Sequence, residues 1–149
     1  MNQMSTTGVV VARALMSVVF ILNGLGIIDQ TIPAKELMEH GAPAGLVPLI
    51  MLSGRVLELI AGVALAMGIL PRLSAVALLA FLIPATLISH SFWQAAGTPA
   101  FMGQLINFSK NMAICAGLLF IASNPLQPTL VSFNKIRSKR LVATTASSA

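Results

Sequence analysis

The sequence predicts an all-α, polytopic membrane protein whose four transmembrane helices form a bundle. The chain has 149 residues, of which 56% are hydrophobic and only 9% are charged. An ordinary soluble domain carries about 25% charged residues, so this chain has too few to cover a water-facing surface. Four stretches are also apolar over the roughly 20 residues that a helix needs to cross a bilayer. Because a helix pairs its own backbone groups in lipid, we expect each stretch to be helical.

The predicted spans cover about residues 8–28, 46–70, 73–93 and 104–123. The segment between the first two, residues 29–45, carries several charged residues and is predicted to be a water-exposed loop. Pro71-Arg72 and Ala96-Gly97-Thr98-Pro99 provide the next two breaks. We therefore expect one four-helix domain over residues 1–123, followed by a basic, disordered cytoplasmic tail over residues 124–149.

The charges indicate an orientation for the bundle. Five basic residues outside the spans fall on one side: Arg72, Lys135, Arg137, Lys139 and Arg140. The loops on the other side hold Lys35 with Asp29, Glu36 and Glu39. Because loops rich in Lys and Arg stay in the cytoplasm, both termini are expected there. The basic tail also accounts for the net charge of +5, so no nucleic-acid partner is expected.

Polar side chains inside the apolar spans are the candidate functional residues. A charged residue at the centre of a span costs about 2.5–3.5 kcal/mol, whereas each large apolar residue returns about 0.3–0.6. Such residues therefore tend to face the bundle interior and to mark sites. We expect one polar pocket in the outer half of the bundle, open to the extracytoplasmic side. Its predicted members are Asn23, Arg55, Glu58, His90, Asn107, Lys110 and Asn111.

Each of these residues also has a structural interpretation. Arg55 and Glu58 lie three apart on one helix face, so they can form an intrahelical pair that directs helix packing. Lys110 can extend outward to the membrane surface, and His90 can belong to an interfacial aromatic belt. The two asparagines of the fourth span can serve as interhelical hydrogen-bond donors. Arg13, near the inner end of the first span, is expected to reach the cytoplasmic headgroups.

The sequence contains no self-contained catalytic, metal or cofactor motif. The chain has one cysteine, Cys115, and its two histidines, His40 and His90, lie in a loop and near the end of a span. These residues offer neither a metal-ligand spacing nor a pair of haem ligands. We therefore do not expect the chain to be an enzyme alone, although it could be a subunit of an oxidoreductase.

Ordered segments of the chain resemble the DoxX family of small bacterial membrane proteins. They are Arg13-Ala14-Leu15, Asn23-Gly24-Leu25-Gly26, Gly54-Arg55-Val56-Leu57-Glu58, Gly68-Ile69-Leu70-Pro71-Arg72-Leu73, Pro84-Ala85-Thr86, His90-Ser91-Phe92-Trp93, Gln104-Leu105-Ile106-Asn107-Phe108 and Lys110-Asn111. The resemblance covers nearly all of residues 10–123. Family members often carry a Lys shortly after the first-helix glycines, where this chain has Ile27 and Ile28.

The resemblance implies a four-helix integral protein of the bacterial inner membrane. The family takes its name from a subunit of a thiosulfate:quinone oxidoreductase, and some relatives belong to oxidative-stress assemblies. It thus implies an accessory or quinone-associated subunit of a redox complex, with a quinone as ligand and redox-enzyme subunits as partners. Two alternatives remain open: a small proton-coupled transporter, which would need a homodimer, and a purely structural or assembly factor.

Overall fold

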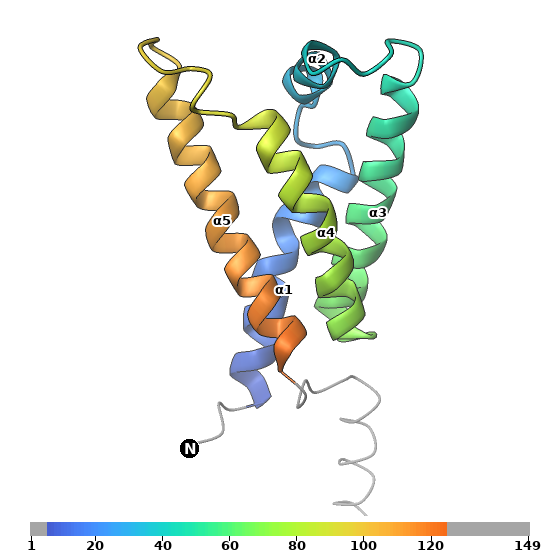
Figure 1. Cartoon of the computed structure of the whole chain (residues 1–149). Coiled ribbons are helices and arrows are strands. Elements are labelled where there is room, and N and C mark those ends of the chain that lie inside the picture. The colour runs from blue at the N-terminus through green and yellow to red at the C-terminus, as the bar shows by residue number, and fades with distance from the viewer. Residues whose placement is uncertain (1–5, 125–149) are drawn as a thin grey trace, which may run out of the picture.

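The fold is a bundle of four long helices, with one additional short helix packed at one end (Figure 1). The computed structural model describes residues 6–124, in which the helices are α1 (Thr6–Gly24), α2 (Thr31–Glu39), α3 (Val47–Met67), α4 (Pro71–Ser89) and α5 (Phe101–Ser123). No strand occurs in this part of the chain. The long helices are long and apolar enough to cross a membrane. The predicted fold class is therefore confirmed, whereas residues 125–149 of the expected basic tail lie outside the described residues.

The first span is shorter than expected because of how α1 ends. The backbone N–H of Gly26 donates to the carbonyl of Asn23 at 2.9 Å, and that of Ile27 donates to Leu22 at 3.0 Å. This pair of bonds forms a Schellman motif, which needs a residue with positive φ at its centre. Gly26 provides it with a φ of 73°. The helix therefore ends at Gly24, and the chain turns toward α2 instead of continuing to residue 28.

The segment predicted as a water-exposed loop contains α2. The Asp29 carboxylate precedes this helix and accepts hydrogen bonds from the Thr31 backbone N–H at 3.0 Å and from its hydroxyl at 2.8 Å. These bonds favour the charged carboxylate and hold the pKa of Asp29 below its ordinary value. Pro33 lies early in the helix, where its missing N–H costs no intrahelical bond. α2 contacts α3 and α4 across the end of the bundle opposite to the start of α1 (Figure 1).

Glycines allow α1 and α3 to pack with their backbones close together. A Cβ atom on Gly24 would lie 2.6 Å from Leu59 Cβ and 2.8 Å from the Arg55 carbonyl oxygen. A Cβ on Gly62 would lie 3.2 Å from Phe20 Cβ. Such close approach is the usual basis of helix association in lipid, where dispersion contacts replace the hydrophobic effect.

The core lies where the four long helices meet, and many large apolar side chains face outward. The buried core residues include Phe20, Leu65, Leu78 and Leu118. Outward-facing side chains such as Leu15 are more than half exposed, as expected for a surface that contacts lipid.

Arg13 does not follow the expectation of a side chain that reaches the headgroups. It is 1% exposed, and its guanidinium lies beside Gly68, where an added Cβ would come within 2.7 Å of Nη2. Gly68 ends α3 in a second Schellman motif, with Ile69 donating to the Ala64 carbonyl at 2.8 Å. Because a helix C-terminus carries partial negative charge, it attracts the cation inward. The prediction for Arg13 is therefore wrong.

Replacing Gly24 by Ala should destabilise the protein by about 1–3 kcal/mol, because the new methyl group would overlap α3. The free energy of unfolding in mixed micelles, measured by detergent titration, tests this. Gly103→Ala in α5 is the matched control, since nothing lies within 4 Å of its added Cβ. Equal effects of the two substitutions would contradict the close α1–α3 contact.

Candidate functional site

A cavity of about 630 Å³ lies at the α2 end of the bundle. It is bounded by α2, the end of α1, the first half of α3, the second half of α4 and the first half of α5. Its charged and amide side chains are Asn23, Asp29, Gln30, Glu36, Arg55, Glu58, His90, Gln104, Asn107 and Asn111. Six of the seven residues predicted for a polar pocket therefore line a single cavity.

Lys110 is the predicted pocket residue that the structure places elsewhere. It is exposed on α5 and is not among the residues that line the cavity. Its neighbour Asn111 does line the cavity, and one helical step turns a side chain by about 100°. Spacing along the sequence grouped Lys110 with the asparagines, but the rotation of α5 directs it outward. Lys110 is therefore exposed on the outside of α5, away from the cavity.

Glu58 is the deepest charged group of the site and is held by α1. Its side chain is only 3% exposed. The Asn23 amide Nδ2 donates to both carboxylate oxygens, at 2.9 Å and 3.0 Å. Asn23 Oδ1 in turn accepts a hydrogen bond from Gln30 Nε2 at 3.2 Å. These bonds compensate part of the cost of burying a carboxylate and tie α1 to α3.

Arg55 does not form the predicted pair with Glu58. Within residues 6–124 the Arg55 side chain makes no ion pair or hydrogen bond, and the one ion pair in that range joins Lys35 and Glu39 at 3.6 Å. The Arg55 guanidinium instead lies directly against Gly26, at the C-terminal end of α1. Residues three apart on a helix diverge by about 60°, which lets Glu58 face Asn23 while Arg55 faces the end of α1.

A second network crosses the cavity from α4 to α2. His90 Nδ1 lies 3.0 Å from Gln104 Oε1, and Gln104 Nε2 donates to Glu36 Oε1 at 3.4 Å. Glu36, Gln30 and Gln104 were not predicted as site residues, because residues 29–45 were expected to form a loop and residue 104 to end a span. The Asp29-Gln30-Thr31 sequence followed by Pro33 is a helix-start signal that could have revealed α2.

The two asparagines of α5 have different surroundings. Asn111 Nδ2 donates to the Thr86 hydroxyl at 3.0 Å, and that hydroxyl donates to the Leu82 carbonyl at 2.7 Å. Asn111 therefore links α4 to α5, as expected for an interhelical hydrogen bond. Asn107 lines the cavity without a hydrogen bond to any other described side chain, so its amide remains available to a ligand.

An aromatic cluster follows His90, where α4 connects to α5. The ring of Phe92 makes edge-to-face contacts with Trp93 at 5.2 Å and with Phe108 at 5.1 Å between centroids. Such clusters are common at the membrane–water boundary. His90 precedes the cluster by two residues, so it combines a place beside an aromatic belt with a place in the cavity wall.

Comparison with known proteins identifies the family. The sequence profile of the DoxX family matches residues 8–91, which is more than half of the chain. The chain belongs to the DoxX family. It is also 31% identical over 141 residues to the inner membrane protein YqjF of Escherichia coli strain K12, covering 94% of this chain and 99% of that protein. No solved structure matches the chain. This DoxX-family protein is thus a multi-pass protein of the inner membrane, embedded in the lipid bilayer.

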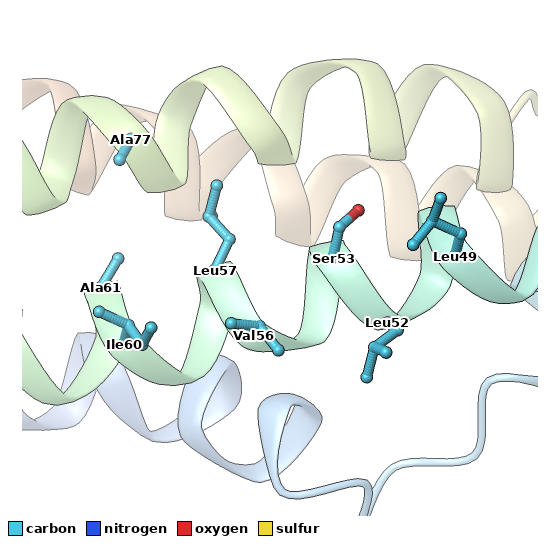
Figure 2. Close-up of a pocket in the computed structure, with 8 residues that line it drawn as sticks. All are labelled: Leu49, Leu52, Ser53, Val56, Leu57, Ile60, Ala61 and Ala77. Carbon is cyan, nitrogen blue, oxygen red and sulfur yellow. The ribbon is translucent and has the colours of Figure 1, made fainter.

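The DoxX-family protein also has an apolar groove between α3 and α4, of about 560 Å³ (Figure 2). Figure 2 shows that Ala77 comes from α4 and the other labelled residues from α3. The hydroxyl of Ser53, the polar side chain in the groove, already donates to the Ile50 carbonyl at 2.8 Å. The groove offers no free polar group and suits the acyl chains of surrounding lipid, so the polar cavity is the candidate functional site.

Asn23→Leu should lower the free energy of unfolding by about 1–3 kcal/mol, because it leaves the buried Glu58 carboxylate without its donor. Adding Glu58→Leu should recover most of this loss, since the pair would be replaced by apolar side chains. Detergent titration of the two single variants and the double variant measures the coupling. Independent, additive effects would show that the two side chains do not interact.

Proposed function

We propose that this protein is an accessory membrane subunit that binds a quinone-type molecule in the polar cavity, beside a redox-active partner in the inner membrane. The observation that carries the proposal is an amphipathic cavity of about 630 Å³ that contains a cation, Arg55, with no paired carboxylate among the described residues. Small-molecule sites are typically clefts of about 300–1,000 Å³ with apolar walls and a few convergent polar groups.

The cavity walls suit an aromatic headgroup with an apolar tail. Apolar surface comes from three helices, through Phe20 of α1, Phe81 and Leu82 of α4, and Ile114 of α5. The polar groups gather closer to α2, so a ligand entering from the bilayer could keep its tail among apolar side chains. This arrangement favours an amphipathic lipid-soluble ligand over a fully water-soluble one.

Hydrogen-bond donors lie on opposite walls of the cavity. Arg55 projects from α3, and Asn107 projects from α5. Two carbonyl oxygens on opposite sides of a ring could each accept from one of these walls. Asn107 supplies the second donor, whereas Lys110, which the sequence predicted as a pocket residue, lies outside the cavity.

The proposal includes an orientation and a partner. Arg13 and Arg72 lie at the end of the bundle where α1 begins, whereas Lys35 lies on α2 with Glu36 and Glu39. This asymmetry favours cytoplasmic termini and a cavity that opens toward the extracytoplasmic side. A bound quinone must exchange electrons with another group, which a redox-enzyme partner subunit would supply.

Arg55→Met should weaken binding of a short-chain quinone, decylubiquinone, by about ten-fold, because one carbonyl oxygen loses its charged donor. Equilibrium dialysis of the purified full-length protein in lipid nanodiscs measures the affinity. Lys110→Met is the matched control, because it removes a cation of α5 that does not line the cavity. No saturable binding by the unaltered protein, or equal losses in both variants, would contradict the proposal.

The buried carboxylate also favours a second function, proton-coupled transport. Glu58 lies inside a transmembrane helix and lines a cavity that also contains the carboxylates of Asp29 and Glu36. Intramembrane carboxylates commonly mark proton pathways. Reconstituted vesicles distinguish the two functions. A transporter carries protons with its substrate and loses flux in Glu58→Gln, whereas a quinone-associated subunit moves no net protons without a partner enzyme. Alternating access with four spans would require a homodimer.

A further inference from the structure

We propose that the ligand of the cavity is a membrane-resident amphiphile that enters sideways, between α1 and α5, and leaves its apolar chain in the bilayer. The inference rests on the proposed function, since it concerns the same cavity, and it adds an entry route and the chain that the ligand must carry. It derives from which helices of the bundle pack against each other beside the cavity.

Three sides of the bundle are closed by helix packing. α1 and α3 approach each other closely at Gly24. Between α3 and α4, a Cβ on Gly54 would lie 2.9 Å from the Phe81 ring, and α2 contacts both of these helices. Between α4 and α5, Asn111 donates to the Thr86 hydroxyl at 3.0 Å. A ligand therefore has little room to enter through these sides.

The fourth side, between α1 and α5, is open over the half of the bundle near α2. The two helices contact each other briefly, where an added Cβ on Gly117 would overlap Met16 Cε. From there α5 leans away from α1 toward the α2 end (Figure 1). Beyond this contact, Val19 of α1 and Asn107 and Ile114 of α5 line the cavity. The cavity thus reaches the surface of the bundle between the two helices.

A hydrogen bond bounds this α1–α5 opening at the α2 end. Gln104 Nε2 of α5 donates to Glu36 Oε1 of α2 at 3.4 Å. The opening therefore lies between this bond and the Met16–Gly117 contact, on the side of helices that are long and apolar enough to span the membrane. A side opening at this level faces lipid, and in the proposed orientation it faces the outer leaflet.

The edge of the opening is apolar on the α1 and α2 side. Val19, Ile28 and Ile32 line the cavity and are also 37%, 39% and 67% exposed, which places them at its edge. The polar interior lies behind them, with Glu58 only 3% exposed. An apolar edge in front of a polar interior suits a ligand that moves its headgroup inward from lipid.

The apolar chain of such a ligand needs no binding site of its own. A cavity of about 630 Å³ suits a drug-sized molecule, so it can enclose a headgroup with a short chain, and a longer chain must extend out of it. Lipid tails are as apolar as a leucine side chain, so a chain that stays among them loses little. The protein therefore holds the headgroup, and the bilayer holds the chain.

Val19→Trp should weaken binding of decylubiquinone about ten-fold, because the indole ring fills the path of the chain. The same benzoquinone without its decyl chain should keep its affinity within about two-fold, since it lies wholly inside the cavity. Equilibrium dialysis of the full-length protein in nanodiscs measures the first compound, and competition against it measures the second. Val18→Trp is the matched control, because Val18 is exposed on α1 and does not line the cavity.

Ile114→Trp tests the opening from α5, with Ile106→Trp as its control outside the cavity. Retained binding of the chain-less compound shows that each variant is folded, and the inference requires a selective loss of decylubiquinone in both. Equal weakening of the two compounds, no weakening in either variant, or failure of the chain-less compound to bind would overturn this inference and leave the proposed function standing. If the unaltered protein binds neither compound, both proposals fail.

Discussion

A carboxylate buried within the bilayer is the constraint on which the α2 end of this protein depends. Glu58 is 3% exposed on a transmembrane helix and is held by a single amide, that of Asn23. Leaving a charged group without donors in a low-dielectric interior is costly, so α1 must bring Asn23 to α3. Gly24, the next residue along α1, allows the helix backbones to approach closely enough for this contact. The hydrogen bonds between Asn23 and Glu58 and the close packing of α1 against α3 therefore depend on each other.

Two arginines reinforce the same helix pair from opposite ends. Arg55 of α3 lies against Gly26, which ends α1, and Arg13 of α1 lies against Gly68, which ends α3. Each guanidinium thus lies at the negative end of the neighbouring helix, where a cation is stabilised. Gly26 and Gly68 each have two roles. They adopt the positive φ that ends the helix, and their lack of a side chain leaves room for the guanidinium. This reciprocal arrangement places both arginines against helix ends inside a largely apolar bundle.

The sequence predicted the four membrane spans well, because each needs only a long apolar stretch. The element it missed, α2, is short and charged, and its position depends on contacts with α3 and α4 that no local pattern encodes. The sequence also identified most of the cavity residues by their polarity within the spans. It could not determine where they face. Arg55 and Lys110 were grouped with neighbours by spacing, yet Arg55 lies against the end of α1 instead of pairing with Glu58, and Lys110 lies outside the cavity.

Together these features produce a convergence of polar groups from all five helices in one cavity at the α2 end. Cysteine labelling in intact cells tests it most directly, in a background where the one cysteine, Cys115, is replaced by Ser. Asn107 and its neighbour Ile106 are both exposed on α5, but of the two only Asn107 lines the cavity. A membrane-impermeant maleimide added outside the cells should label Asn107→Cys and spare Ile106→Cys, which would face lipid. Equal labelling of the two positions, or labelling of Asn107→Cys from the cytoplasmic side alone, would contradict the account.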